Sequence, residues 1–265
     1  MPASRDLTSP AARLVLHLGA HRTGTTFLQQ FLRVNERALL AKGCQVVYPP
    51  KSRKSGLPPL LNGLTVISEE NYLGGMRGCV RTGTPYPFAA ERLTQLPEPL
   101  ASADMVYLSI RDLAEWWTSV IAFGVKMGHP LPTPAALEHL SRSQRGWVDV
   151  VEDILAALPT ARLVVRDAGW RLDDPAAQLK RLTNWSVWDG LTFERQVHNP
   201  RPDVHAMAQA LLARADFSSL ARLPEDGDFA PFDPTQAARL GVRYQADLAR
   251  LAADDRIEFW AADAA

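Results

Sequence analysis

Residues 14–27 read LVLHLGAHRTGTTF, and this stretch constrains the fold more than any other part of the chain. An apolar run predicts a buried strand, a loop bounded by Gly19 and Gly24 follows, and a predicted helix begins at Thr25. The two glycines have the G-x-x-x-x-G spacing of a phosphate-binding loop, in which backbone N–H groups and a helix N-terminus converge on an anion. Thr25 stands where a nucleotide hydrolase has the lysine that reaches the outer phosphates, and the nearby cation is Arg22 inside the loop. We therefore expect the loop to bind a phosphate, but not the triphosphate of a nucleotide hydrolase.

Apolar runs and helical patterns alternate along much of the chain. The runs occupy 14–19, 44–48, 64–68, 105–110 and 162–166, and three of them are nearly continuous, as expected of strands covered on both faces. Helical patterns occupy 25–42, 113–127, 147–158, 202–214 and 234–252. This alternation predicts an α/β fold with a parallel five-stranded sheet flanked by helices. No buried strand is expected from about residue 197 onward. The chain should thus form one domain, 1–265, with a core over about 12–195 and a mainly helical C-terminal cover over about 196–265.

Composition excludes several classes of function. The formal net charge is zero, so no overall field attracts nucleic acid or an anionic membrane, and any anion site has to be local. Cys44 and Cys79 are too few for a disulfide framework and match no metal-ligand spacing. Residues 1–13 lack the apolar core of a signal peptide, and no window approaches the ~20 apolar residues of a membrane span. We expect a cytoplasmic protein without nucleic-acid or membrane partners, and the sequence indicates no oligomeric state.

A second basic position closes the fourth apolar run, in the stretch SIRDLAEWWTSVIAFG. Arg111 ends the predicted strand, and Ser119 follows eight positions later in the predicted helix. Because parallel strands end at the same edge of a sheet, Arg111 and the first loop belong to one crevice. Arginine can bind a phosphate through two N–H groups, and a serine adds a neutral hydrogen bond. Alone, Arg111 would be interpreted as part of an ion pair, for example with Asp112, so the phosphate site depends on the two motifs together.

With these two motifs the chain resembles the sulfotransferases that use 3′-phosphoadenosine 5′-phosphosulfate (PAPS). The loop with which that family binds 5′-phosphosulfate reads like residues 21–29, HRTGTTFLQ, with lysine more usual at position 22. The family's 3′-phosphate site is an arginine at a strand end and a serine eight residues later, as Arg111 and Ser119 stand here. The motifs occur in the family's order, about ninety residues apart, and the resemblance covers roughly residues 12–185. The C-terminal part resembles bacterial members only loosely.

The resemblance implies a P-loop-related fold and transfer of a sulfuryl group from PAPS to a hydroxyl or amine of a small-molecule or glycan acceptor, with no metal required. The residues that it assigns to PAPS binding are Arg22, Thr23, Gly24, Thr25, Thr26, Phe27, Arg111 and Ser119. Arg22 would also act in catalysis by stabilising charge on the bridging and sulfuryl oxygens as the phosphate leaves. Arginine does not donate a proton at neutral pH, so this stabilisation has to be electrostatic. PAPS has two anionic ends, for which the sequence offers two separate cation sites at one sheet edge.

The acceptor also needs a base, and Glu69 and Glu70 close the third run, LTVISEENY, at the same sheet edge. A carboxylate whose pKa is raised by burial could take a proton from a hydroxyl or an amine. Several groups of the resembling family use a glutamate, and related bacterial sequences often carry Ser-x-Glu here, which favours Glu70. The alternative is an acidic pair that caps the following turn. His21 is the third candidate base, or it only orients the loop.

Several other residues could belong to the core as well as to a site. His17 is expected in the core because it alternates within a strand, and Trp116 and Trp117 are expected to pack their helix on the sheet. Phe27 could contact the adenine or the core. Lys51, Arg53 and Lys54 are expected in a solvated loop, from which they could attract an anionic acceptor. The residues that could reach the crevice from the start of the C-terminal part are His198, Asn199 and Arg201.

Two other functions stay open. A P-loop kinase or NTPase would use LTVISEE as a metal-coordinating strand, but this chain lacks the lysine at position 25. A non-catalytic nucleotide-binding relative is compatible with arginine in place of lysine at position 22. Loops over 49–63 and 71–87 are expected to shape the acceptor pocket.

Overall fold

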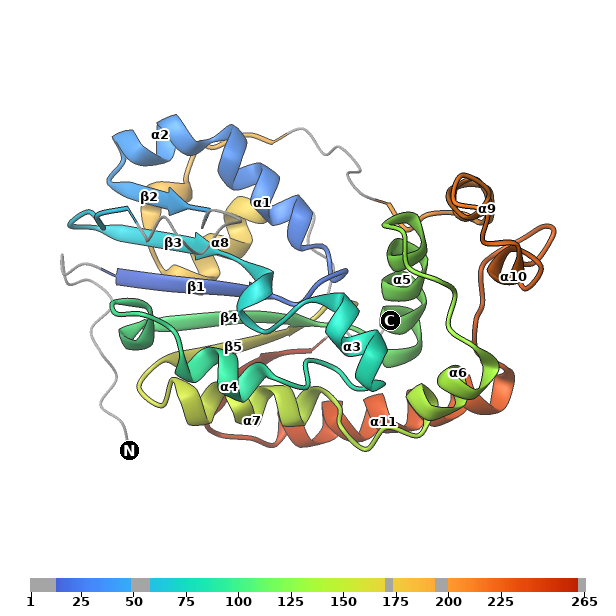
Figure 1. Cartoon of the computed structure of the whole chain (residues 1–265). Coiled ribbons are helices and arrows are strands. Elements are labelled where there is room, and N and C mark those ends of the chain that lie inside the picture. Colours follow the sequence, from blue (N-terminus) through green and yellow to red (C-terminus); the bar gives the residue numbers. More distant parts are fainter. Residues whose placement is uncertain (1–12, 49–57, 170–173, 194–199, 262–265) are drawn as a thin grey trace.

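The computed structural model describes residues 13–48, 58–169, 174–193 and 200–261. Its centre is a six-stranded sheet in the order β2-β3-β1-β4-β5-β6, in which each neighbouring pair of strands is parallel (Figure 1). The strands are β1 (Arg13–Gly19), β2 (Cys44–Val47), β3 (Leu64–Ser68), β4 (Met105–Ile110), β5 (Arg162–Asp167) and β6 (Ile257–Trp260). The predicted α/β fold with a parallel sheet is confirmed, and the first five strands lie where the apolar runs placed them.

Helices connect the strands and cover both faces of the sheet. They are α1 (Thr25–Val34), α2 (Glu36–Ala41), α3 (Met76–Thr82), α4 (Ala89–Thr94), α5 (Leu113–Lys126), α6 (Pro134–Ser141), α7 (Trp147–Ala157), α8 (Pro175–Thr183), α9 (Val204–Leu212), α10 (Phe217–Leu220) and α11 (Pro234–Ala252). Short 3-10 turns are η2 (Glu70–Tyr72), η3 (Leu100–Ser102) and η4 (Ser186–Trp188). The helices predicted over 113–127, 147–158, 202–214 and 234–252 are confirmed as α5, α7, α9 and α11. Of the helices described, none combines the length and the apolar character that crossing a membrane requires.

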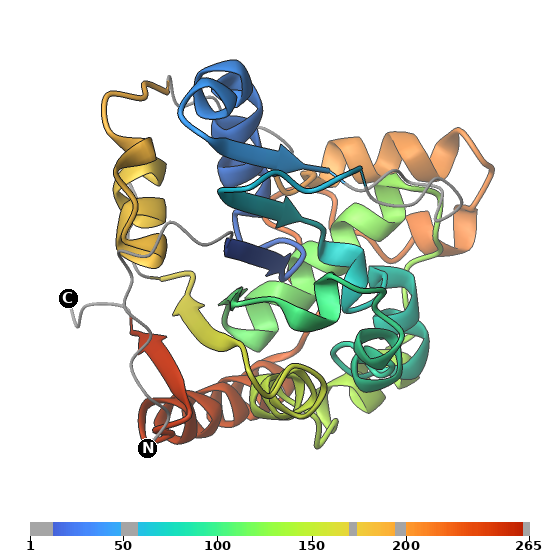
Figure 2. The ribbon, with the colours of Figure 1, turned by 90° about the vertical axis from the view of Figure 1, so that its left-hand side faces the viewer.

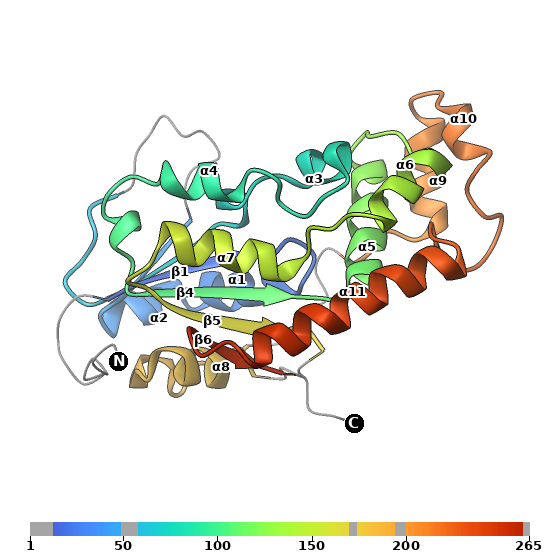
Figure 3. The same ribbon diagram turned by 90° about the horizontal axis from the view of Figure 1, so that it is seen from below.

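Two apolar cores hold these layers together. Helices α1, α2 and α8 pack on one face of the sheet, whereas α4, α7 and α11 lie on the other (Figures 1 and 2). Helix α11 runs along α7 towards β6, and α9 and α10 pack beside α5, away from the sheet (Figure 3). Every residue of β3 and β4 is buried, as is β1 after Arg13. Coverage on both faces explains why these strands appear in the sequence as nearly continuous apolar runs.

The sheet has six strands, so the prediction of five strands and a C-terminal part without a strand is wrong. Strand β6 pairs in parallel with β5, with Val165 opposite Phe259. Its sequence, IEFW, has only four residues, and the first three of them are half-buried because β6 lies at the edge of the sheet. So short a segment with a central glutamate has no continuous apolar run, and its strand character comes from pairing with β5 and from burial of Trp260.

Two further predictions need correction. The helix predicted over 25–42 divides into α1 and α2 at Asn35, whose side-chain Nδ2 donates to the carbonyl oxygen of Phe31 at 3.0 Å. An asparagine side chain that hydrogen-bonds to the backbone of the preceding turn competes with continuation of the helix. The loop predicted over 74–87 contains α3, which ends where Gly83 adopts φ +71°. Much of the proline-rich loop over 49–63, including Lys51, Arg53 and Lys54, lies outside the described residues.

Candidate functional site

The loop between β1 and α1 has a backbone that few sequences could adopt. Gly19, Arg22 and Gly24 have φ values of +101°, +64° and +88°. A Cβ atom at Gly19 would lie 3.0 Å from the Cγ of Glu70 and 3.2 Å from the backbone nitrogen of His21, so glycine makes room for both. For a non-glycine residue such as Arg22, the left-handed conformation costs on the order of 1 kcal/mol, and such strain is concentrated at functional sites.

The carbonyl oxygens of this loop are turned toward donors of the surrounding protein. The Nε1–H of Trp116 donates to the carbonyl oxygen of His21 at 2.8 Å, and Arg166 Nη2 donates to that of Thr23 at 3.2 Å. Arg111 Nη1 donates to the carbonyl oxygen of Arg22 at 3.3 Å. The Thr23 hydroxyl closes the loop internally by donating to the carbonyl oxygen of residue 20 at 2.7 Å. A loop held in this way keeps its negative backbone dipole ends away from a bound anion.

Arg22 and Ser119, which belong to the two different sequence motifs, contact each other. The Nε–H of Arg22 donates to the Oγ of Ser119 at 2.9 Å, and the guanidinium lies 5.0 Å from the ring centroid of Phe123. Ser119 is buried in α5, and Arg111 supports the Arg22 backbone. The two motifs therefore form one cluster in which both arginines stand on the same side of the loop.

Arg111 forms an ion pair with Glu115, one turn into α5, with Nη2 3.0 Å from Oε2. The pair suggested by the sequence, with Asp112, is absent among the described contacts because the Asp112 carboxylate caps α5 by accepting from the Glu115 backbone. Arg201 reaches the same Glu115 oxygen from the segment before α9, at 3.3 Å. The pKa of Arg22 is lowered, chiefly because the side chain is partly buried. The positive charges of Arg111 and Arg201 lie close enough to lower it further.

A cavity of about 500 Å³ opens beside this cluster, at the carboxyl ends of β1, β4 and β5. Its volume is within the range of pockets for nucleotide-sized ligands. Its lining comes from the loop, from the end of β4, and from the end of β5 together with α11: Arg22, Thr23, Gly24, Arg111, Asp112, Asp167, Ala168, Gly169 and Tyr244. Within this lining, the Tyr244 hydroxyl donates to Asp167 Oδ1 at 2.8 Å. The cavity is thus lined by two arginines and by the two aspartates Asp112 and Asp167.

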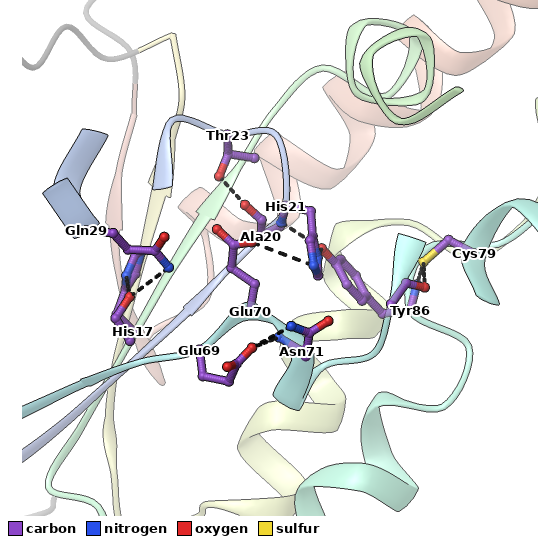
Figure 4. Close-up of polar contacts among 12 residues, drawn as sticks. His17, Ala20, His21, Thr23, Gln29, Glu69, Glu70, Asn71, Cys79 and Tyr86 are labelled. Atoms are coloured by element: carbon purple, nitrogen blue, oxygen red, sulfur yellow. Dashed lines mark hydrogen bonds and ion pairs between the residues drawn. The ribbon is translucent and has the colours of Figure 1, made fainter. Parts of the chain in front are cut away.

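On the other side of the loop, next to β3, Glu70 is the member of the acidic pair that points toward the loop, and its side chain is half-buried (Figure 4). Its carboxylate accepts a hydrogen bond from Thr25, and its Oε2 lies 3.6 Å from the Nε2 of His21. Burial, partly offset by the Thr25 hydrogen bond, raises the pKa of Glu70 to about 7. A group that titrates near neutral pH is suited to accept a proton from an acceptor.

Glu69 has the capping role that the sequence analysis gave as the alternative. Its Oε1 accepts from the Asn71 backbone N–H at 2.8 Å and from the Asn71 side chain at 2.6 Å, which caps the 3-10 turn η2. Figure 4 shows the two glutamates pointing in different directions, with Glu70 toward the loop. The structure therefore separates the pair into a glutamate that caps a turn and a half-buried glutamate beside the loop.

His21 is buried, and burial lowers its pKa to about 4. Its Nδ1 lies 2.9 Å from the hydroxyl of Tyr86, and its backbone N–H donates to the same hydroxyl at 2.8 Å. A buried ring with so low a pKa accepts a proton only weakly, and one of its two nitrogens is already occupied by a tyrosine hydroxyl. Its position between Tyr86 and Glu70 favours the orienting role over that of a base.

The remaining predicted residues have varied positions. Thr26 is half-buried in the first turn of α1, and Phe27 packs edge-on against Phe193 with ring centroids 5.1 Å apart. His17 is a core residue whose Nδ1 is 2.8 Å from Ser68 Oγ, and Trp116 and Trp117 are fully buried, as predicted. His198 and Asn199 lie outside the described residues.

Several residues of the site were not found from the sequence. Arg166 and Asp167 are the last residues of β5, and Arg111 directly follows β4. Arg111 was located because parallel strands end at the same edge of a sheet, and the same argument would also have located Arg166 and Asp167. Tyr86 and Tyr244 come from a loop and from a helix face, and no spacing in the sequence marks them. Trp147 is a further case, because its Nε1 donates to the Arg111 carbonyl oxygen at 2.7 Å.

Comparisons with known proteins add no family. No protein-family model matches the chain, and a search of curated proteins finds no significant match. Within the described part of the chain, no three His, Cys, Asp or Glu side chains gather in a way that could hold a metal ion. The interpretation of the site therefore depends on its own residues.

Proposed function

We propose that this protein is a PAPS-dependent sulfotransferase, which transfers a sulfuryl group to a hydroxyl or amine of a small-molecule or glycan acceptor. The observation that carries the proposal is the position of the β1–α1 loop between two different chemical groups. The cavity with Arg22 and Arg111 lies on its β4 side, and the half-buried carboxyl group of Glu70 lies on its β3 side. A donor held in the cavity would thus have a proton acceptor across the loop.

The cavity suits an anionic nucleotide such as PAPS. Two arginines supply charge, and arginine binds phosphate through paired N–H groups. The loop carbonyls of His21, Arg22 and Thr23 are all occupied by protein donors, which lowers repulsion toward an anion at this helix N-terminus. We assign Arg111 to the 3′-phosphate end of the ligand and the loop, with Arg22, to the 5′-phosphosulfate end.

The proposed reaction needs charge stabilisation and one proton transfer. The acceptor oxygen or nitrogen forms a bond to sulfur while the bond from sulfur to the bridging phosphate oxygen breaks, and Glu70 takes the acceptor's proton. Arg22 stabilises the negative charge that develops on the leaving phosphate, and it does so as a fixed cation. Glu70 suits its role because its pKa of about 7 leaves a substantial fraction ionised at neutral pH.

The structure also gives a reason to prefer this function over that of a P-loop kinase or NTPase. Thr25 occupies the position of the lysine that reaches the outer phosphates in such enzymes, and its hydrogen bond goes to Glu70. The residue thus supports the proposed base. A non-catalytic nucleotide-binding protein would have the same cavity, but it would have no use for a carboxyl group with a raised pKa beside the loop.

Titration with 3′-phosphoadenosine 5′-phosphate (PAP) and with ATP–Mg²⁺, followed by isothermal calorimetry, tests the binding step. We expect PAP to bind without metal and at least tenfold more tightly than ATP–Mg²⁺. Arg111→Ala should weaken PAP binding, and Arg142→Ala is its matched control. Exposed Arg142 forms the same type of i,i+4 pair, with Glu138, outside the cavity lining. Tighter binding of ATP–Mg²⁺ would contradict the proposal.

Transfer of labelled sulfate from PAPS, or its release to water, then separates an enzyme from a binding protein. Glu70→Gln should lower this activity by roughly 10²–10⁴-fold, the usual range for loss of a general base. Glu69→Gln is the matched control and should be mild, since Glu69 caps a turn. PAP binding without any transfer or release across an acceptor panel would favour the non-catalytic alternative.

A further inference from the structure

Tyr86 determines which ring nitrogen of His21 carries the proton. Its hydroxyl oxygen accepts from the His21 backbone N–H at 2.8 Å and lies 2.9 Å from His21 Nδ1. Within the described residues, these two nitrogens are its hydrogen-bond partners, and the tyrosine is fully buried. If Nδ1 carried a proton, the hydroxyl hydrogen would have no acceptor in a site without solvent, which is costly. The hydroxyl therefore donates to Nδ1, and the neutral ring has its proton on Nε2.

The groups around Nε2 agree with this tautomer. Glu70 Oε2 lies 3.6 Å from Nε2, a close approach that is longer than a hydrogen bond, as is common before a substrate is bound. The Asn71 side chain hydrogen-bonds to the His21 ring, and its amide nitrogen is used on Glu69, so its oxygen is what remains for the ring. Figure 4 shows Glu70 on the side of His21 that faces away from Tyr86. Two acceptors thus face the proposed Nε2–H.

We propose that Tyr86 is a positioning residue, which fixes His21 as an Nε2–H donor toward Glu70 and so orients the carboxylate that takes the acceptor's proton. The proposal rests on the function proposed above for Glu70. It also assigns His21, the third candidate base, the role of a hydrogen-bond donor. In that role the His21 ring keeps its proton throughout the reaction, and the acceptor's proton goes to Glu70.

The fold holds Tyr86 firmly in a strained conformation. Its φ is +42°, which a bulky residue adopts only where its surroundings require it. Arg145 donates to the carbonyl oxygens of Pro85 at 2.8 Å and of Tyr86 at 3.0 Å, and Arg145 itself pairs with Asp153. The aromatic ring packs against both Trp116 and Trp147, with centroid distances of 5.7 and 6.3 Å. This support, spread over three elements, fixes the hydroxyl with respect to His21.

The chain contains a second histidine–tyrosine pair that serves as an internal control. His17 stacks on Tyr107 with ring centroids 5.4 Å apart, close to the 5.9 Å of His21 and Tyr86. His17 Nδ1 is bound to Ser68 Oγ, however, and the Tyr107 hydroxyl accepts from Gln178. Among the hydrogen bonds of the described residues, none joins the Tyr107 hydroxyl to a ring nitrogen of His17.

The first test is ¹⁵N NMR of the histidine rings at pH 7 in the wild type, Tyr86→Phe and Tyr107→Phe, which needs neither acceptor nor turnover. We expect His21 in the wild type as the Nε2–H tautomer, and in Tyr86→Phe a mixture with the Nδ1–H form. Tyr107→Phe should leave His21 unchanged. An Nδ1–H or imidazolium His21 in the wild type, or an unchanged tautomer in Tyr86→Phe, would overturn the proposal.

The second test is kinetic. Tyr86→Phe should lower kcat at least tenfold with little change in KM for PAPS, and it should move the rising limb of the pH profile to higher pH. The reason is that a lost Nε2–H donor makes the ionised carboxylate less favourable. The charged and titratable groups that face the His21–Glu70 pair are Glu69, Arg22 and Tyr86. Because Tyr86 is uncharged at neutral pH, neither Tyr86→Phe nor Tyr107→Phe changes the charge around this pair.

His21→Gln completes the design, and it keeps the test decisive if Tyr86→Phe does not fold. Glutamine can place an N–H where the histidine has Nε2–H, but it cannot accept a proton. We expect His21→Gln to retain activity within about tenfold, whereas a loss of a hundredfold or more would show that His21 is the base. Absence of sulfate transfer in the wild type, with the tautomer as expected, would count against the proposed function and leave the Tyr86–His21 geometry established.

Discussion

The Nε–H of Arg22 donates to the Oγ of Ser119 at 2.9 Å, and this bond joins two residues from different motifs that lie 97 positions apart in the sequence. Ser119 is only 1% exposed and is not among the described residues that line the cavity. Its influence on a ligand therefore passes through Arg22. The serine of the second motif orders the cation of the first.

Ser119→Ala tests this relationship. Without the Oγ acceptor, Arg22 loses the bond that fixes its side chain, so we expect turnover to fall by about tenfold while PAP affinity changes less than threefold. Kinetics and calorimetry on the same preparation measure the two effects. A large loss of PAP affinity, with no loss for adenosine 5′-phosphosulfate, would instead indicate that Ser119 binds the 3′-phosphate directly.

Substitutions of Arg22 should affect turnover more than affinity, since a cation acting on the developing charge matters most in the transition state. Arg22→Lys keeps the charge and should retain activity, because the resembling family usually has lysine here. Arg22→Ala should lose most of it. Initial rates at saturating PAPS measure both variants, and an active Arg22→Ala protein would remove this residue from the chemistry.

Arg111→Ala should weaken PAP binding by ~2 kcal/mol or more, the scale of a lost charge-assisted hydrogen-bond pair. Adenosine 5′-phosphosulfate lacks the 3′-phosphate, so its affinity should hardly change. Calorimetry with both ligands provides the comparison, with Arg142→Ala as the control for loss of an exposed arginine. Equal losses for both ligands would assign Arg111 to support of the Arg22 backbone, to which it donates.

Glu115 holds Arg111 and Arg201 through one carboxylate oxygen, at 3.0 and 3.3 Å. An anionic ligand has to compete with this internal carboxylate for the arginines. Glu115→Gln should therefore tighten PAP binding by about two- to fivefold at low salt, a modest effect because the pair is exposed. The gain should shrink as salt rises. Weaker binding in this variant would mean that Glu115 positions the arginines for the ligand.

Glu70 should make both activity and stability depend on pH. Its folded-state pKa of about 7 lies above the usual value of 4.5, so turnover should rise with pH up to about 7. The folded state favours protonated Glu70, and the free energy of unfolding should therefore fall as pH rises between 4.5 and 7, by roughly 3 kcal/mol at ~1.4 kcal/mol per unit.

Urea unfolding of the wild type and of Glu70→Gln at pH 4.5 and pH 8 measures this effect. The variant should be clearly more stable than the wild type at pH 8 and similar to it at pH 4.5. His21, with a pKa lowered to about 4, contributes in the opposite direction as pH falls below 6.5, and it is present in both proteins. Equal stability of the two proteins at pH 8 would show that the Glu70 carboxylate is not disfavoured by burial.

The sheet core was predictable because buried parallel strands require apolar residues on both faces, and β1, β3 and β4 satisfy this requirement almost without interruption. Strand β6 was not predictable, since four edge residues with Glu258 among them carry no such pattern. Its place depends on the partner strand. The break at Asn35 was equally hidden, because the apolar spacing of 25–42 continues across it while a single side-chain hydrogen bond decides where α1 ends.

For the site, parallel topology made the sheet edge predictable but not the side-chain directions. Arg111 and the loop were expected in one crevice, where the structure has them. The contact of Arg22 with Ser119 depends on a left-handed backbone at a non-glycine residue, which no propensity indicates. Tyr86 reaches His21 from a loop that returns from α3, and a contact between residues 65 apart leaves no periodic signal.

The tryptophans around the loop also give the protein an optical property. Trp116 and Trp147 donate to the backbone carbonyls of His21 and Arg111, one in each motif. The Trp116 ring centroid lies 4.6 Å from that of Trp117 and 5.1 Å from that of Trp147. Indoles so close together couple their electronic transitions, and near-ultraviolet circular dichroism responds to their relative orientation. The spectrum of the unlabelled protein should therefore change whenever an anion moves either motif, and a stopped-flow instrument could follow that motion in real time.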